Sequence, residues 1–328
     1  MKIGYEASDC PAHERAYYGG LLERLKEEFG KDFATFDCPD INDLKNFDGK
    51  FDLIIVKSRI GADAIIDQCC KSKSFLIDHG PIHCNRTYIN WCRSHFEVFS
   101  SPTLQREYEA TGFRPIIKGY SGGFFLTNSL DALHPDPKAC LVYLIPWEGL
   151  RANSVTPTPF SEVDTVFFLR GLSPLFDHVH VVNHLCDGRA NFAIRHRKHL
   201  PQNVRPVANG EDFRNLVCNV GAVIFEYSSV FAIALWNPEV RLFYRRPACP
   251  YGPLSPHNQI FHQIMYEACY LIVDDDVSAV KRDLFNDTKK DERVRAKKLI
   301  YDENIKDPYE AIINAIYDAL ALIANTAS

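Results

Sequence analysis

Residues 51–80 read FDLIIVKSRIGADAIIDQCCKSKSFLIDHG, and this stretch decides the fold. FDLIIVKS, residues 51–58, is a compact apolar run of the kind that forms a buried strand of a parallel sheet. IGADAIIDQCCKS then has the pattern of a helix, and SFLIDHG predicts another strand that ends at a polar turn. A strand, a helix and a strand in this order form the repeating unit of a doubly wound parallel sheet.

The same alternation continues on both sides of this unit. Upstream, MKIGYEA and FATFD predict strands, and GLLERLKEEFG between them predicts a helix that stops at Gly30. Downstream, the strand-like segments ACLVYLIP, HVHVVNH, GAVIFEYSS and VRLFYRR repeat the plan in the second half of the chain. The sequence therefore predicts the α/β fold class, with a doubly wound parallel sheet in each half.

The length of the chain predicts more than one domain. Its 328 residues exceed the size at which a single hydrophobic core stops growing. The polar, proline-bearing stretch TNSLDALHPDP, residues 127–137, has the composition of a linker. We therefore expect a first domain at 1–126, a second at 138–306 and an amphipathic closing helix at 307–328.

Composition and charge argue against several classes of protein. The formal net charge is -5 and no dense basic block occurs, which is unlike a protein that coats nucleic acid. No segment has the length of a membrane span, and the opening residues KIGYEASDC have no signal-peptide core. The 11 cysteines are an odd number without a CxxC pair, which suits a reducing compartment. We therefore expect a cytoplasmic protein.

Ligands of open parallel sheets bind at the carboxyl ends of strands, and this rule selects a few loops. In the loop after SFLI, His79 is the candidate general base, and Gly80 lets a substrate approach the backbone. A structural turn in which His79 caps a helix is the alternative. In KGYSGG, residues 118–123, Gly119 and its neighbour Tyr120 belong to a loop whose amides could face a phosphate; a domain-end loop is the alternative.

A further loop lies in VIFEYSSVFAIAL. A strand ends there at Glu226 and Tyr227, and an apolar helix begins at Ser228 and Ser229. Serines at a helix start can cap it and leave its free amides and dipole facing a phosphate. We interpret this segment as an anion site; ordinary capping by either serine is the alternative.

The last selected loop is basic. IRHRKHL, residues 194–200, contains Arg195 and His196, and such a density of cations in an acidic protein predicts a diphosphate clamp or a stabiliser of the leaving group. A solvated surface loop is the alternative. We find no Asp-x-Asp motif and no HExxH spacing, so we expect no metal ion and no cofactor.

These segments resemble, in order, the motifs of the CDP-glycerol glycerophosphotransferase family, the teichoic-acid-type polymerases and primases. VIFEYSSVFAIALWNPEVRLFY is similar to its D-Y-S-S-x-x-x-D-x-A motif and the apolar F-Y strand that follows, and is the most specific match. IDHGPIHCNRTY and IRHRKHL look like its two histidine motifs, and SHFEVFSSPTLQREYEATGFRPIIKGY looks like its glycine-tyrosine segment. The resemblance covers residues 75–245 in patches.

The resemblance implies a GT-B fold, in which two Rossmann-like domains face each other across a cleft. The carboxyl-terminal domain would hold a cytidine nucleotide donor as substrate, and the amino-terminal domain would hold the acceptor. His79 and His196 would take the two family histidine positions, one as the base and one near the phosphates. Ser228 and Ser229 would contact the donor phosphate. The other expected donor-site residues are Gly80, Gly119, Tyr120, Arg195, Glu226 and Tyr227.

Departures from the family pattern leave the donor open. Glu226 stands where an aspartate is usual, and Arg197 replaces the proline after the second histidine. The family's carboxyl-terminal serine-arginine motif is not evident near YDENIKDPYEA. Related bacterial enzymes that use CMP-activated acidic sugars in capsule synthesis share a similar histidine-glycine and serine-serine arrangement.

The sequence thus predicts a metal-independent transferase that moves a glycerophosphate, polyol phosphate or sugar from a cytidine nucleotide to an acceptor hydroxyl. The process would be the synthesis of a cell-surface polysaccharide or a teichoic-acid-like polymer. The expected partner is a polysaccharide or lipid-linked acceptor and not a nucleic acid; a lipid-linked acceptor would bring the protein to the inner face of the membrane. The alternatives are a GT-B glycosyltransferase with a CMP-, UDP- or GDP-activated sugar, and a non-enzymatic two-domain protein that binds a small ligand.

Overall fold

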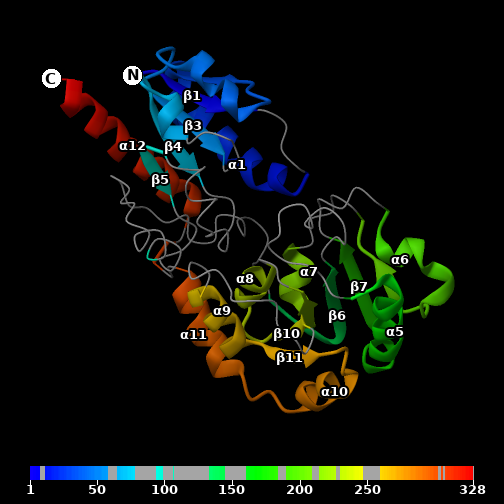
Figure 1. Cartoon of the computed structure of the whole chain (residues 1–328). Coiled ribbons are helices and arrows are strands. Elements are labelled where there is room, and N and C mark those ends of the chain that lie inside the picture. The colour runs from blue at the N-terminus through cyan, green and yellow to red at the C-terminus, as the bar shows by residue number, and fades with distance from the viewer. Residues whose placement is uncertain are drawn as a thin grey trace. The chain divides into compact units, whose positions relative to one another are not determined.

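The computed structural model describes residues 1–7, 12–57, 65–77, 94–98, 106, 133–144, 160–183, 190–208, 214–226, 230–246, 259–301, 304–305 and 307–327 (Figure 1). The chain forms two compact units. The first contains residues 1–127, 255–260 and 298–328, and the second contains 128–254 and 261–297. Residues 255–260 and 298–306, which the sequence placed in the second domain, therefore belong to the first unit.

The first unit contains a parallel sheet of five described strands. They are β1 (Ile3–Glu6), β2 (Phe33–Phe36), β3 (Leu53–Lys57), β4 (Lys73–Ile77) and β5 (Phe96–Val98). Their order is β2-β1-β3-β4-β5, which is one of the two common orders of doubly wound sheets. The strand predicted at 51–58 is the central one, and its residues 53–56 are fully buried.

Three described helices accompany this sheet: α1 (Ala12–Phe29), α2 (Ile65–Gln68) and α12 (Pro308–Ala327). Helix α1 ends before Gly30, whose φ of 50° is a left-handed conformation that glycine adopts at little cost. Contacts with α1 hold α12 in this unit. Arg24 forms a 2.9 Å salt bridge with Asp307, and the hydroxyl of Tyr317 donates a hydrogen bond to Glu28.

The second unit contains a parallel sheet of six described strands. They are β6 (Asp136–Leu144), β7 (His178–Asn183), β8 (Val204–Pro206), β9 (Val220–Phe225), β10 (Arg241–Arg246) and β11 (Tyr270–Val273). Their order is β11-β10-β9-β6-β7-β8. Numbered from β6 as the first strand and read from the β8 edge, this order is 3-2-1-4-5-6, the strand order of dinucleotide-binding domains.

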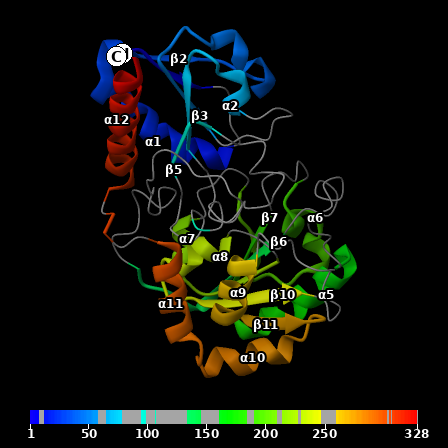
Figure 2. The same ribbon diagram turned by 60° about the vertical axis from the view of Figure 1, so that its left-hand side comes forward.

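Helices surround this second sheet (Figure 2). They are α5 (Glu162–Leu172), α6 (Phe192–Arg195), α7 (Arg214–Asn219), α8 (Val230–Leu235), α9 (Gln259–Ala268), α10 (Val277–Phe285) and α11 (Lys290–Ile300). Helices α5, α6 and α10 share a core with one face of the sheet, in which Phe168, Phe192 and Val280 are buried. The two parallel sheets with their helices confirm the predicted fold class.

Strand β6 begins inside the predicted linker, since Asp136 and Pro137 are its first residues. A proline is tolerated there because the pairing with β9 shifts register between Asp136 and Cys140. Gly221 of β9 allows the close approach at this irregularity. A Cβ atom at position 221 would lie 2.6 Å from the Cα of Pro137.

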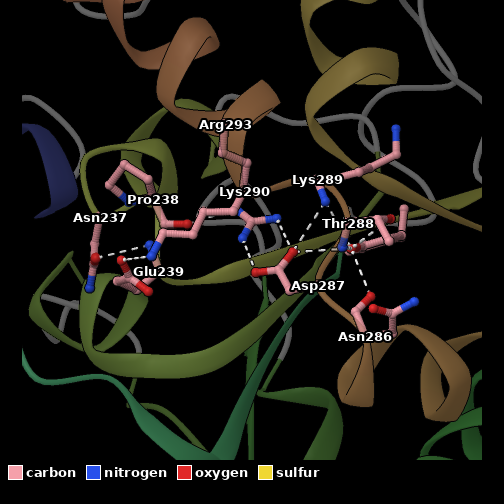
Figure 3. A network of polar contacts seen from close by, with 10 residues as sticks. Asn237, Pro238, Glu239, Asn286, Asp287, Thr288, Lys289, Lys290 and Arg293 are labelled. Carbon is pink, nitrogen blue, oxygen red and sulfur yellow. Dashed lines mark hydrogen bonds and ion pairs between the residues drawn. The ribbon is translucent and has the colours of Figure 1, made fainter.

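The buried side chain of Arg293 connects α11 to neighbouring segments by hydrogen bonds (Figure 3). Arg293 is fully buried, and both terminal nitrogens of its guanidinium donate to the carboxylate of Asp287. Its Nε donates to the carbonyl of Pro238 at 2.8 Å, in the turn between α8 and β10. All three guanidinium nitrogens of Arg293 therefore donate to acceptors inside the protein, so the buried charge keeps its hydrogen bonds.

Candidate functional site

The second sheet has a topological switch point between β6 and β9. From β6 the chain continues outward through β7 and β8, and from β9 it continues in the other direction through β10 and β11. At such a point the connecting segments diverge and leave a crevice outside the carboxyl ends of the two strands, where ligands of this fold class bind. Strand β9 ends at Phe225, so Glu226 stands directly at this place.

Helix α5, the first described helix after β6, begins with a complete capping box. The Ser161 side chain accepts from the backbone of Asp164 at 3.0 Å, and the Ser161 backbone donates to the Asp164 carboxylate at 3.0 Å. This arrangement satisfies two amides at the helix start and fixes the direction of the first turn. Glu162 and Thr165 of this turn contact two separate groups of polar residues.

Glu162 joins the two predicted site residues of the basic segment. Its carboxylate accepts from Nη1 of Arg195 at 2.5 Å and lies 2.9 Å from Nε2 of His196. Partial burial acts to raise the pKa of Glu162, but its hydrogen bonds and charge interactions with Arg195 and His196 outweigh this and lower the pKa. The His196 ring also lies 4.3 Å from that of Phe192, between ring centroids. Glu162 therefore fixes the orientation of the imidazole, as carboxylate partners of functional histidines do.

The arginines of the basic segment have partners within the protein. Nε of Arg195 donates to the carbonyl of Ala190 at 3.0 Å, besides its bond to Glu162. Nη1 of Arg197 donates to the carbonyl of Val204 at 3.0 Å. Arg197 and Lys198 are both exposed. The segment thus combines a structural role for its arginines with an exposed cationic surface.

The second group of polar residues is centred on Arg245, near the carboxyl end of β10. Arg245 is only 2% exposed, and its Nη1 donates to Glu226 at 2.8 Å. Its Nε and Nη2 donate to the two carboxylate oxygens of Asp275, at 2.6 and 2.8 Å. Nη1 also contacts the hydroxyl of Thr165 at 3.3 Å, and the ring of Phe168 lies 4.6 Å from the guanidinium carbon. Three adjacent strands and α5 are therefore joined at the carboxyl edge.

Asp275 is held in an unusual backbone conformation. Asp274 and Asp275 have φ values of 48° and 62°, which non-glycine residues adopt at a cost of about 1–3 kcal/mol each. Such strain persists only where surrounding contacts fix it, and the two hydrogen bonds from Arg245 to the Asp275 carboxylate are such contacts.

The triplet 274–276 also corrects the sequence analysis, because its letters do form an Asp-x-Asp motif. Its side chains have structural partners in this protein. Asp275 binds Arg245, and Asp276 caps α10 by accepting from the backbone of Ser278 at 3.0 Å. Within the described residues, no group of three or more His, Cys, Asp or Glu side chains is placed to hold a metal ion.

In the first unit, the switch point lies between β1 and β3. Glu6 ends β1 there and is fully buried. Its Cα pairs with that of Phe36 in β2, and its neighbour Tyr5 pairs with Ile55 in β3. Strand β4 ends at Ile77, directly before the Asp-His-Gly segment, as the sequence predicts. A carboxylate buried at a switch point is a candidate functional group that the sequence analysis missed.

Several predicted site residues lie outside the described part of the chain. They are His79, Gly80, Gly119, Tyr120, Tyr227, Ser228 and Ser229. Of the predicted set, the structure describes Arg195, His196 and Glu226, and it gives each of them a charged partner. Arg245, Asp275 and Glu162 are the partners that sequence reasoning missed. The only available signal was the pair of arginines that ends the apolar strand VRLFYRR.

Among the described helices, none is long and apolar enough to cross a membrane.

Comparisons with known proteins address the fold. No protein-family model and no curated protein sequence matches the chain. The structure is similar to one described as a UDP-N-acetylglucosamine 2-epimerase from Listeria monocytogenes, with a TM-score of 0.61 and 12% identity over 98% of this chain and 96% of that chain. It is also similar to the wall teichoic acid polymerase TagF, with a TM-score of 0.54 and 10% identity over 99% of this chain and 89% of that one.

A third similar structure is that of the calicheamicin glycosyltransferase, with a TM-score of 0.52 and 10% identity over 99% of this chain and 98% of that chain. All three matches extend over nearly the whole chain, so the likeness includes both sheets and not a single Rossmann-like domain. The chain therefore has the GT-B fold, with two Rossmann-like parallel-sheet domains.

Proposed function

We propose that the protein is a transferase that moves a glycerophosphate, polyol phosphate or sugar from a cytidine nucleotide donor to an acceptor hydroxyl. The process is the synthesis of a cell-surface polysaccharide or a teichoic-acid-like polymer. One observation carries most of the proposal. The strand that leads into the Tyr-Ser-Ser segment is β9, and β9 ends at the switch point of a sheet with the strand order of dinucleotide-binding domains.

The electrostatics of this edge support a phosphate ligand. Arg245 offsets one of the two negative charges of Glu226 and Asp275, so these carboxylates repel an anion less than they would without the arginine. Arg195 offsets the charge of Glu162 in the same way. A nucleotide phosphate then meets the amides and hydroxyls of the segment that follows Glu226.

In the proposed reaction, the acceptor oxygen attacks the phosphorus of a polyol phosphate donor or the anomeric carbon of a sugar donor. The bond from that atom to the oxygen of the departing nucleotide phosphate breaks as the new bond forms. His79 takes the proton of the acceptor hydroxyl. His196, oriented by Glu162, and the serine pair stabilise the charge that develops on the leaving phosphate.

The nucleotide preference tests the proposal first. Calorimetric titration of the protein with CDP, CMP, UDP and GDP is expected to show the tightest binding for a cytidine nucleotide. Tighter binding of UDP or GDP would favour a glycosyltransferase or, in view of the epimerase-like structure, another enzyme that acts on a nucleotide-activated sugar. Equal affinity for all four would contradict the cytidine assignment.

Replacement of the proposed base separates an enzyme from a binding protein. In His79→Ala, we expect nucleotide affinity to stay within about twofold of the original, because the base contacts the acceptor, while turnover falls about 100-fold or more. Turnover is measured as release of CMP or CDP from the donor in the presence of a lipid-linked or polysaccharide acceptor. Equal turnover in the variant and the original would exclude His79 as the base.

A further inference from the structure

Strand β10 ends in two adjacent arginines whose surroundings differ completely. Side chains of neighbouring residues in a strand point to opposite faces of the sheet. Arg245 lies on the face of Phe243, where it meets Phe168 of α5. Arg246 lies on the opposite face with Tyr244, where both contact the ring of Tyr266 in α9.

Arg245 has little capacity left for a ligand. All three of its guanidinium nitrogens donate to protein acceptors, and its side chain is 1% exposed. Its single positive charge is already paired with two carboxylates, Glu226 and Asp275. Arg245 therefore belongs to the structure of the edge rather than to its ligand chemistry.

Arg246 is half-buried and has no such acceptor among the described residues. Its Nε is buried and has no hydrogen-bond partner, and no salt bridge to Arg246 is found among the residues that the structure describes. The guanidinium carbon lies 5.6 Å from the centroid of the Tyr266 ring, which holds the side chain over an aromatic face but accepts no ordinary hydrogen bond. A buried donor without an acceptor is costly and rare in native proteins, so the Arg246 guanidinium is available to an acceptor that the described residues do not supply.

The position of Arg246 indicates what kind of ligand this is. It is the last residue of β10, and its Cα pairs with that of Val273, the last residue of β11. On the β9 side, Tyr244 pairs with Phe225. Arg246 is two residues beyond Tyr244 along β10, so it lies level with the point just beyond Glu226. Arg246 therefore stands at the carboxyl edge next to the switch point, where anionic groups of nucleotides bind in this fold class.

We propose that Arg246 is a phosphate-binding residue of the nucleotide site, and that its guanidinium donates to oxygens of the donor's diphosphate. This inference rests on the proposed nucleotide-dependent function and adds a specific residue to its site. Arginine suits the role because its planar fork can donate two parallel hydrogen bonds to one phosphate. Neighbouring Asp275 does not compete for the cation, since it is bound to Arg245.

The test compares three variants by calorimetry with CDP, pyrophosphate and cytidine as probes. Arg246→Ala is expected to weaken the binding of CDP and of pyrophosphate about 10-fold or more, the effect of a lost hydrogen-bonded charge. Its affinity for cytidine, which has no phosphate, stays unchanged. Arg246→Lys is expected to be intermediate, because lysine keeps the charge but not the fork. Arg295→Ala removes an arginine that is 67% exposed on α11 and is expected to bind every probe as the original does.

The outcomes also separate this inference from the cytidine assignment. If the original protein prefers UDP or GDP, the cytidine assignment fails, and the same variants are compared with that nucleotide and with pyrophosphate. Binding of the preferred nucleoside diphosphate by Arg246→Ala within twofold of the original would overturn the inference. Failure of the original protein to bind any nucleoside diphosphate or pyrophosphate would overturn it as well. Thermal unfolding shows whether Arg246→Ala is folded; if it is not, the comparison of Arg246→Lys with the original decides.

Discussion

Loss of Arg245 is expected to destabilise the second unit strongly, by about 3–5 kcal/mol, in the variant Arg245→Ala. The structure supplies the reason for this magnitude. The variant leaves Glu226 and Asp275, whose side chains are 8% and 18% exposed, without their shared cation. Removal of one partner from a buried ion pair costs more than the pair contributes, because the remaining charge stays buried and uncompensated.

Urea denaturation at pH 7 measures this effect, with Trp236 of the second unit as a fluorescent probe. Arg295→Ala is the matched control, since it breaks a pair with Glu292 in which the two side chains are 67% and 31% exposed. We expect the control to lose about 0.5 kcal/mol or less. A loss below about 1 kcal/mol in Arg245→Ala would refute the reasoning, because it would mean that the two carboxylates are well solvated without the arginine.

Two further variants test other parts of the account. In Arg293→Ala, the carboxylate of Asp287 loses its fully buried partner, so urea denaturation should show a loss of about 3–5 kcal/mol; a loss as small as that of an exposed arginine would contradict the role of this contact. In Glu162→Gln, the contribution of a carboxylate whose pKa is lowered by Arg195 and His196 disappears. That contribution is present above the ordinary pKa of a glutamate and is lost as the pH falls through the lowered value, so the original and Glu162→Gln should differ in stability at pH 7 and converge towards pH 3. A difference that grows on acidification would exclude this interpretation.

The alternation of strands and helices could be predicted from the sequence because it depends on local patterns. The buried strand at 51–58 and the glycine stop of α1 at Gly30 are examples, since runs of apolar residues and the conformational freedom of glycine act within a few residues. Strand order could not be predicted in this way. Only contacts between distant segments decide that β6 lies between β7 and β9.

The borders of the two units could not be predicted from local patterns either. The closing helix was recognised by its periodicity, but its place in the first unit depends on contacts such as that between Arg24 and Asp307, residues that are far apart in the chain. The predicted linker extended into β6 because Pro137 has the composition of a loop. A register shift in the pairing with β9 makes room for this proline, and no local pattern announces that shift.

For the candidate site, the sequence supplied single residues but not their partners. Glu226 and the pair Arg195 and His196 were selected because they follow predicted strands or lie in a basic run. Their partners, Arg245 and Glu162, come from other segments of the chain. The effect of these partners is chemical, since a paired carboxylate orients a neighbouring group and repels a phosphate less strongly. Such a role appears only once the fold has brought the residues together.

The central claim is that the carboxyl edge of the second sheet, at the β6 and β9 switch point, binds the phosphates of a nucleotide. A crystal structure of the protein with CDP tests this most directly. The account predicts density for the diphosphate beyond Glu226, within hydrogen-bonding distance of Arg246 and of the segment 227–229. Nucleotide bound elsewhere, with Arg246 still lacking an acceptor, would contradict the claim.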